Sequence, residues 1–178
     1  MDLSKVSIGK NPPAEINVFI EIEKGVSSAK YELDKESGAL FVDRFLSTAM
    51  YYPGNYGFIP HTLSNDGDPC DVLVVGCDSV TPGVIIRSRP IGVLFMEDEG
   101  GKDEKIIAVP QGTIDTIQSY EQLSKETRNQ IAHFFGHYKD LEKGKWVNIA
   151  SWGSPEQAKT IITEAIERAQ RKKDETNK

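Results

Sequence analysis

The sequence predicts an α+β protein, mainly β, built as a closed β-barrel with two C-terminal helices packed on its outside. Over the first two-thirds of the chain, short apolar runs are separated by Gly, Pro, Asn and Asp. Many short strands with turn residues between them are typical of a barrel. Two amphipathic segments follow towards the C-terminus. No repeat or linker divides the 178 residues, so we expect residues 1–178 to form a single domain.

The strands are predicted from alternating side chains and from short apolar runs. Residues 16–22 carry isoleucine or valine at every second position, which gives one apolar face and places Glu21 on the other, polar face. Residues 30–34 alternate in the same way, with Lys30 and Glu32 sharing one face. Further strands are predicted at residues 39–42, 71–76, 84–89, 91–96, 106–109 and 146–149.

The two helices are predicted from apolar stripes and capping residues. From Ser124 onward, apolar side chains recur at i, i+3, i+4 and i+7, at Ile131, Phe134, Phe135 and Tyr138. The last helix is expected to begin with Ser154 as its N-cap, followed by Pro155 and by Gln157 three residues after the cap. The charged tail from Arg171 onward is expected to fray.

Composition narrows the classes of function. The chain has 27 acidic and 21 basic residues and a net charge of -6, which argues against a general nucleic-acid binder. Residues 1–11 lack the apolar core of a signal peptide, and no run approaches the roughly 18 apolar residues of a membrane span. Cys70 and Cys77 offer no disulfide framework. We therefore expect a cytoplasmic protein that does not bind membranes.

The first candidate site is the acidic segment 66–71. Asp66 and Asp68 are two residues apart and point to the same side of an extended stretch, while Asp71 begins an apolar strand. Carboxylates this close raise each other's pKa unless a positive charge compensates them. Oxygen-only ligands favour hard cations such as Mg2+, Mn2+ or Ca2+. Taken alone, however, the segment is explained more simply as an Asx-rich surface turn.

Further acidic residues favour a metal site at segment 66–71 over a simple surface turn. Residues 97–105 are dense in carboxylates and are expected to form a loop between two strands. Taken alone, this loop is explained more simply as a solvated hairpin loop. Glu21 and Glu32 lie on two neighbouring predicted strands. If the barrel brings these groups to segment 66–71, the site holds several divalent ions.

Cationic and aromatic residues supply the complementary charge. Arg44 lies between apolar neighbours, where an arginine is costly unless it is paired or faces a cleft. Residues 51–60 form a Pro- and Gly-rich loop with three tyrosines, of which Tyr51 is equally well explained as a packing residue. Tyr138 and Lys139 add another such pair at the end of a helix. Carboxylates for metals together with cations for a polyanion indicate metal-assisted phosphoryl transfer.

Several segments, in order along nearly the whole chain, resemble the soluble family I inorganic pyrophosphatases of bacterial type. Residues 66–71 match the family's D-x-D-P-x-D signature, and the match also covers residues 30–32, 36–44, 52–60, 98–105 and 132–139. The resemblance implies an OB-like barrel that hydrolyses inorganic pyrophosphate to two orthophosphates. It also implies direct in-line attack by a metal-activated water, with no covalent enzyme intermediate.

The resemblance implies a role for each matching position. The metal ligands are Glu32, Asp66, Asp71, Asp98 and Asp103. The substrate-binding residues are Lys30, Arg44, Tyr56, Lys105, Tyr138 and Lys139. Asp68 is the general base, and Glu21 and Tyr52 support the site. The implied cofactor is Mg2+, several ions per site and replaceable by Mn2+, and the implied assembly is a homohexamer formed as a dimer of trimers.

Two positions depart from common patterns of the family. Cys70 stands where relatives often have an aliphatic residue, and we expect it to pack as a small apolar side chain. Gly136 stands where relatives often carry a larger residue, which puts in doubt the strength of the contact between trimers. His133 and His137 flank it at i and i+4 but lack the glutamate of an HExxH zinc site.

Two other classes compete with an enzyme. The first is a non-catalytic calcium-binding barrel, but an EF-hand loop that starts at Asp66 would have Asp71 where it needs glycine. The second is an OB-like barrel that binds single-stranded nucleic acid, and the negative charge and clustered carboxylates count against it.

Overall fold

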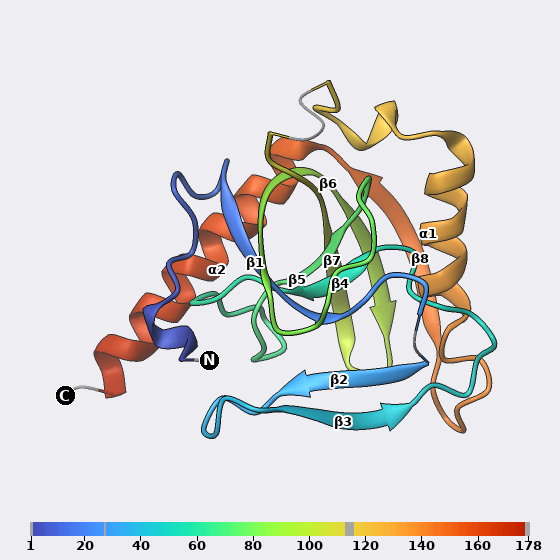
Figure 1. Ribbon diagram of the computed structural model, residues 1–178, viewed down its shortest axis with the longest axis horizontal. Coiled ribbons are helices and arrows are strands. Elements are labelled where there is room, and N and C mark those ends of the chain that lie inside the picture. The colour runs from blue at the N-terminus through green and yellow to red at the C-terminus, as the bar shows by residue number, and fades with distance from the viewer. Residues whose placement is uncertain (1, 27, 113–115, 177–178) are drawn as a thin grey trace.

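The computed structural model describes residues 2–26, 28–112 and 116–176 (Figure 1). Its 3-10 helices are η1 (Leu3–Lys5) and η2 (Tyr120–Gln122). Its strands are β1 (Ile16–Ile22), β2 (Ala29–Leu33), β3 (Leu40–Phe45), β4 (Asn55–Phe58), β5 (Asp71–Val74), β6 (Ile85–Asp98), β7 (Gly101–Pro110) and β8 (Val147–Gly153). Its α-helices are α1 (Lys125–His137) and α2 (Pro155–Thr176).

The main sheet closes on itself. β1, β4, β5, β7 and β6 pair in that order, and a further pairing between β1 and β6 completes the ring. β8 adds to the outer edge of β6. The pairs are antiparallel except for β5 with β7, which run parallel. The predicted fold class, a mainly β, OB-like ring with two C-terminal helices, is confirmed.

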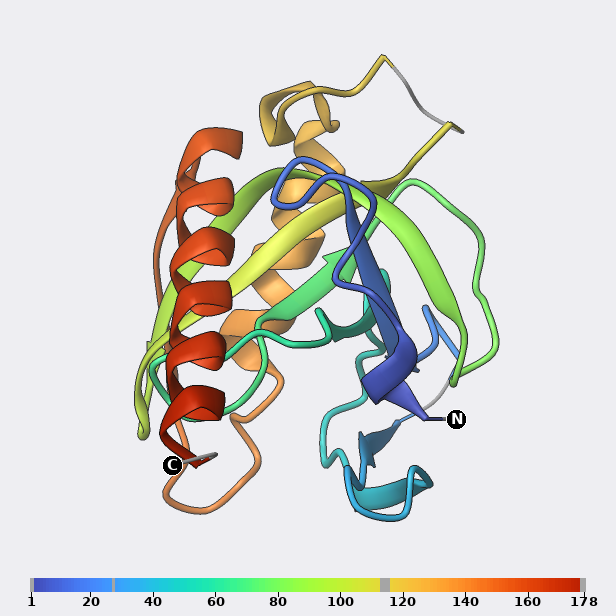
Figure 2. The same ribbon diagram turned by 90° about the vertical axis from the view of Figure 1, so that its left-hand side faces the viewer.

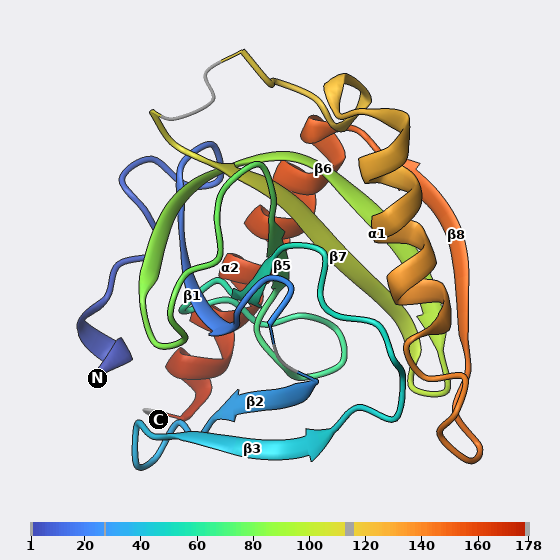
Figure 3. The ribbon, with the colours of Figure 1, turned by 45° about the vertical axis from the view of Figure 1, so that its right-hand side comes forward.

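Each helix packs into its own apolar core. α1 lies alongside β8 (Figure 3), and α2 lies against β6 (Figure 2). Successive residues of β5 point into different cores because side chains alternate along a strand. Leu73 belongs to the core that contains Phe135 of α1, whereas Val72 belongs to the core that contains Ile162 of α2. Both cores therefore depend on the same strands.

The hairpin of β2 and β3 forms a separate two-stranded sheet that lies below the ring in Figure 1. It is tied to β1 by the Glu21 carboxylate, which accepts a hydrogen bond from the backbone N–H of Leu33 at 2.8 Å. Phe19 and Glu21 are consequently buried, at 1% and 8% exposure. The face of β1 opposite its isoleucine and valine side chains is therefore buried as well, because the hairpin covers it.

The acidic hairpin is longer and more regular than the sequence suggests. The predicted strands 84–89 and 91–96 are one strand, β6, with an irregularity between Pro90 and Gly92 that accommodates the missing N–H of proline. The expected loop 97–105 is largely strand, because β6 and β7 remain paired up to Asp98 and Gly101. Asp98 and Asp103 therefore project from rigid strands.

A second correction concerns the expected loop 51–60. Residues 55–58 form β4, which pairs with both β1 and β5 inside the ring. Gly57 makes this pairing feasible, since a Cβ at that position would overlap the carbonyl oxygen of Phe19. Tyr56 is thereby fixed on a central strand.

Both α-helices begin at a serine cap, of which the one at Ser154 was predicted, and the C-terminal tail differs from expectation. Ser124 accepts a hydrogen bond from the N–H of Thr127 at 3.1 Å, and Ser154 and Gln157 form a reciprocal capping box. α2 continues to Thr176, so the predicted fraying from Arg171 is wrong. Lysine and arginine are good helix formers, and they suffice to extend this exposed end. Among the described helices, none is long and apolar enough to cross a membrane.

Candidate active site

A cavity of about 130 Å³ lies between the hairpin and the ring, and seven of the predicted site residues line it. They come from β1, β2, β4 and the start of β5, and from the segment that precedes β5. These residues are Glu21, Lys30, Glu32, Tyr56, Asp66, Asp68 and Asp71. The fold thus brings together side chains that are up to 50 positions apart in sequence.

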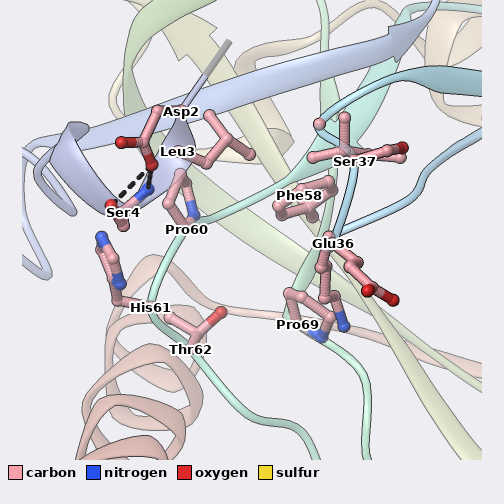
Figure 4. A pocket seen from close by; sticks show the side chains of 13 residues that line it. Asp2, Leu3, Ser4, Glu36, Ser37, Phe58, Pro60, His61, Thr62 and Pro69 are labelled. Atoms are coloured by element: carbon pink, nitrogen blue, oxygen red, sulfur yellow. Dashed lines mark hydrogen bonds between the residues drawn. The ribbon is translucent and has the colours of Figure 1, made fainter.

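A larger cavity, of about 580 Å³, adjoins this one and shares the walls Phe58 and Pro69 with it (Figure 4). Near its N-terminal side, Asp2 accepts hydrogen bonds from the backbone N–H and the hydroxyl of Ser4. None of the predicted site residues lines the larger cavity. Size therefore does not identify the site, whereas the concentration of carboxylates and cations does.

Lys105 is the central cation of the site. The parallel pairing of β5 with β7 sets Asp71 beside Lys105, whose Nζ lies 2.6 Å from Asp71 and 2.7 Å from Asp103. Burial opposes the charge of Lys105, but the two carboxylates outweigh it and raise its pKa well above the ordinary value. The pKa of Asp103 is also raised, first by burial and then by the neighbouring charges of Asp71 and Asp98, against the opposing effect of Lys105.

A second buried lysine joins the end of α1 to the β6–β7 turn. Lys139 donates to Asp98 at 2.6 Å and to Glu99 at 3.3 Å. Burial opposes its charge, yet these partners raise its pKa. The preceding residue, Tyr138, packs on Phe134, and burial raises the pKa of its hydroxyl. Both side chains therefore carry hydrogen-bond donors at neutral pH.

Two more tyrosines form the apolar wall behind Lys105. The rings of Tyr52 and Tyr56 lie 5.0 Å apart, and the ammonium of Lys105 lies 5.8 Å from the centre of the Tyr56 ring. Burial raises the pKa of both tyrosines well above the ordinary value. Their hydroxyls stay protonated and available as donors.

The hairpin supplies two cations from adjoining strands. Lys30 of β2 pairs with Arg44 of β3 in the sheet register, and both approach the carboxylate of Asp43. The Lys30 to Asp43 distance is 3.0 Å, and this hydrogen bond lowers the pKa of Asp43. The Nε of Arg44 lies 3.5 Å from Glu142, which follows α1.

The acidic segment has the geometry of an Asx turn and also faces the cavity. The N–H of Asp68 donates to the carboxylate of Asp66 at 2.9 Å. Both carboxylates are exposed, and Asp68 lies 3.7 Å from the ammonium of Lys35. Cys70 is buried at 2% exposure, which agrees with its expected packing role, and burial raises the pKa of its thiol. Segment 66–71 can therefore form an Asx turn and still present its carboxylates to the cavity.

The carboxylates do not stand in a preformed metal cage. In the described part of the chain, no three His, Cys, Asp or Glu side chains are placed to hold a metal ion together. Lysine ammonium groups instead lie against Asp71, Asp98 and Asp103. The donor chemistry nonetheless fits a hard divalent cation, since these are oxygen-only ligands whose mutual repulsion a cation relieves.

Several charged residues next to the site were given no role by the sequence. Asp43 pairs with Lys30, Glu99 with Lys139, and Glu142 with Arg44. The adjacency of Asp43 to Arg44 was an available signal. No local pattern pairs Glu142 with Arg44, because that contact joins segments almost one hundred residues apart.

A family model described as inorganic pyrophosphatase matches residues 18–170. The chain belongs to the inorganic pyrophosphatase family. The inorganic pyrophosphatase of Bradyrhizobium diazoefficiens is 58% identical over 177 residues, 97% of this chain and 99% of the relative. That of Caulobacter vibrioides is 57% identical over 172 residues, 94% of this chain and 97% of the relative.

Solved structures of the same family are also similar to this chain. The Thermus thermophilus inorganic pyrophosphatase superposes with a TM-score of 0.91 at 40% identity, covering 96% of this chain and 99% of that one. The Coxiella burnetii inorganic pyrophosphatase gives a TM-score of 0.87 at 47% identity, covering 92% and 99%. Membership of this family implies a divalent-metal cofactor and favours an enzyme over a non-catalytic calcium-binding barrel.

Proposed function

We propose that this protein hydrolyses inorganic pyrophosphate to two orthophosphates with Mg2+ as cofactor and Mn2+ as an acceptable substitute. The observation that carries the proposal is the pairing of four cationic side chains with carboxylates in a chain of this family. The cations are Lys30, Arg44, Lys105 and Lys139. Bound divalent ions would screen the substrate's charge and lower the pKa of water towards neutrality.

The carboxylates divide into two groups by position. Asp66, Asp71 and Asp103 would hold the tightest ion, and Asp98 would hold another together with Asp103. Burial of Asp103 and its repulsion by Asp71 and Asp98 support this assignment, because a cation would lower the cost of keeping these charges together. Glu32 is exposed at the cavity edge, which suits contact with an ion through water.

Asp68 is the proposed general base. Its carboxylate is exposed in the cavity, and its own N–H is already committed to Asp66. A base in this position deprotonates and orients water for direct in-line attack on phosphorus. Charge that develops on the departing phosphate is stabilised by buried ammonium groups and by the tyrosine hydroxyls of Tyr56 and Tyr138. Glu21 supports the site from behind by fixing the hairpin.

The first test is phosphate release from pyrophosphate by the wild-type protein and by Asp68→Asn. We expect turnover with Mg2+, none in EDTA, and a fall in kcat of about 10²- to 10⁴-fold in the variant, because loss of a general base costs this much. Asp174→Asn, an exposed change on α2, is the matched control and should keep full activity. Full turnover in EDTA would contradict the metal dependence, and a folded protein that binds Ca2+ but never releases phosphate would favour the non-catalytic barrel.

We further propose that the chain assembles as a homohexamer, a dimer of trimers. Large apolar side chains that are exposed on the single chain support association, among them Val26, Phe45, Tyr51, Leu141 and Trp146. Sedimentation velocity should give about six times the chain mass of 19.8 kDa. A species of one chain mass at micromolar concentration would contradict the proposal.

We also propose a cytoplasmic location. Cys70 and Cys77 are both free thiols, which suits a reducing compartment. Cell fractionation should find the pyrophosphatase activity of this chain with cytoplasmic markers, and its recovery with a membrane or secreted fraction would contradict the location.

A further inference from the structure

Arg44 reaches the site from an exposed strand, and few contacts orient its guanidinium. β3 lies outside the ring, and the Arg44 side chain is 29% exposed. Its Nε is buried but forms no hydrogen bond within the described residues. The guanidinium has ion-pair contacts with Asp43, 3.8 Å from Nη1, and with Glu142, 3.5 Å from Nε. Asp43 is also bound by Lys30, so Glu142 is the carboxylate that faces Arg44 alone.

Glu142 is held in place by the turn that follows α1. Its N–H donates to the carbonyl of Lys139 at 2.9 Å, and its carbonyl accepts from the N–H of Lys145 at 3.2 Å. The side chain is 14% exposed, and its Oε1 is buried without a hydrogen bond in the described structure. A buried carboxylate oxygen is costly unless a positive charge lies beside it, and Arg44 supplies that charge.

Arg44 Nε and Glu142 Oε1 are both buried without a hydrogen bond in the described structure, and they face one another where the hairpin meets the turn after α1. A guanidinium is a planar fork with donors on more than one edge. A carboxylate beside the Nε edge attracts that edge by charge and leaves the Nη2 donors for a second anion. The same contact joins the hairpin to the segment that carries Tyr138 and Lys139.

We propose that Glu142 is a positioning residue that holds Arg44 for pyrophosphate binding. The inference rests on the proposed function, in which Arg44 contacts one phosphate group. Glu142 acts through Arg44 and does not touch the substrate. Its loss should therefore weaken substrate binding and leave the base, Asp68, able to work at saturation.

The test is a double-mutant cycle in pyrophosphate hydrolysis with Mg2+. Glu142→Gln keeps the size of the side chain and removes its charge, and we expect KM to rise about tenfold with kcat changed by less than about threefold. In an Arg44→Gln background the same change should alter kcat/KM by less than about twofold, because the group through which it acts is gone. Glu167→Gln, an exposed change on α2, is the matched control and should behave as wild type.

A second measurement detects the contact without catalysis. In the metal-free, substrate-free protein, the Nε–H proton resonance of Arg44, assigned by its loss in Arg44→Gln, should shift in Glu142→Asp and keep its wild-type position in Glu167→Gln. The shorter side chain withdraws the carboxylate from a contact that is already 3.5 Å long. This variant keeps the charge, and so it serves if Glu142→Gln does not fold.

The outcomes separate the inference from the proposed function. An equal loss of kcat/KM in both backgrounds, or a loss confined to kcat, would overturn the positioning role while pyrophosphate hydrolysis stands. An unchanged Nε–H resonance of Arg44 in Glu142→Asp would overturn it as well. A wild-type protein that does not hydrolyse pyrophosphate would overturn the proposed function first, and the role of Glu142 in it with that.

Discussion

Opposite charges are matched residue by residue within this site. Lys105 and Lys139 are almost fully buried, which is unfavourable for an ammonium group unless carboxylates surround it. Asp71 and Asp103 flank the first lysine, and Asp98 binds the second. The same carboxylates are the proposed metal ligands, so lysines and divalent ions serve the same electrostatic need at this site.

Replacement of Lys105 tests that equivalence. Lys105→Met keeps the apolar stem but leaves Asp71 and Asp103 without their ammonium partner. We expect the free energy of unfolding to fall by about 3 kcal/mol in EDTA, the cost of breaking a buried ion pair. With Mg2+ the loss should be smaller, because the ion supplies positive charge to the same carboxylates.

Chemical denaturation in EDTA and in Mg2+ measures both values. Lys159→Met, a change on the surface of α2 away from these carboxylates, is the control and should lose little in either condition. An identical loss with and without Mg2+ would show that the ion and Lys105 do not share their carboxylates.

Glu21 should make the metal-free protein less stable as the pH rises. Burial, opposed by the Leu33 N–H and reinforced by Asp71 and Glu32, raises its pKa from 4.5 to about 7 in the folded state. The folded state therefore binds more protons than the unfolded state between these values, so this contribution to stability is lost as pH rises through that window. Since each pKa unit corresponds to about 1.4 kcal/mol, the effect is at most about 3.5 kcal/mol.

Glu21→Gln removes this titration and should flatten the curve of unfolding free energy against pH between 4.5 and 8. Denaturant titrations of both proteins in EDTA give the difference, which should shift in favour of the variant as the pH rises. Glu167→Gln should show the wild-type slope. A pH-independent difference between wild type and Glu21→Gln would mean that folding does not change the pKa of Glu21.

Among the strands, the position of the β2–β3 hairpin relative to the ring and the pairing of β5 with β7 determine which side chains meet at the site. The hairpin of β2 and β3 contributes Lys30, Glu32 and Arg44 but lies outside the ring. The ring contributes Asp71 and Lys105 from parallel neighbours. The distance between hairpin and ring therefore sets the width of the cavity, and Glu21 and Glu142 are two acids that bridge the hairpin to the rest of the chain.

The close approach of β1 and β4 is a testable condition for the ring. Gly57→Ala would place a methyl group on the carbonyl of Phe19, so the two strands must separate. We expect a loss of about 3 kcal/mol or more, or failure to fold, as for other overpacked backbone sites. Thermal or denaturant unfolding measures the change.

Gly136→Ala is the matched control on α1. Its added Cβ would meet the nearest atom, of Ile149, at 3.4 Å, which is ordinary contact. We expect a gain of about 0.5 to 1 kcal/mol, because alanine is the better helix former. A Gly57→Ala protein as stable as wild type would contradict the proposed need for glycine in β4.

At the scale of the whole molecule, closure of the ring and sharing of strands should make unfolding cooperative. The pairing of β1 with β6 joins the beginning of the chain to its middle, and β5 contributes to both apolar cores. Neither core can be lost while the other keeps its strands. We propose on this basis that residues 1–178 form a single domain.

Calorimetry at fixed protein concentration should show one transition per chain. Its enthalpy should be about 125 kcal/mol near 60 °C, from about 0.7 kcal/mol for each residue, and it should agree with the van't Hoff value once association is included. Two transitions that separate on addition of denaturant would contradict a single domain.

The parts of the structure that the sequence predicted well are those encoded locally. The cap at Ser154 depends on residues three positions apart, and it forms as expected. The acidic segment 66–71 brings its carboxylates together by adjacency, whatever the fold around it. The alternation of side chains correctly predicted β1 and β2. It did not predict β4 or the full length of the β6–β7 hairpin, because Gly57 and Pro90 are residues typical of turns.

The partners of the charged groups were decided by the tertiary structure. Lys105 lies between Asp71 and Asp103 because β5 and β7 pair in parallel, and Arg44 meets Glu142 because the hairpin packs near the turn after α1. Such contacts depend on register and packing between distant segments, which local patterns do not specify. Local sequence specifies the chemical groups and the family, and folding specifies which group balances which charge.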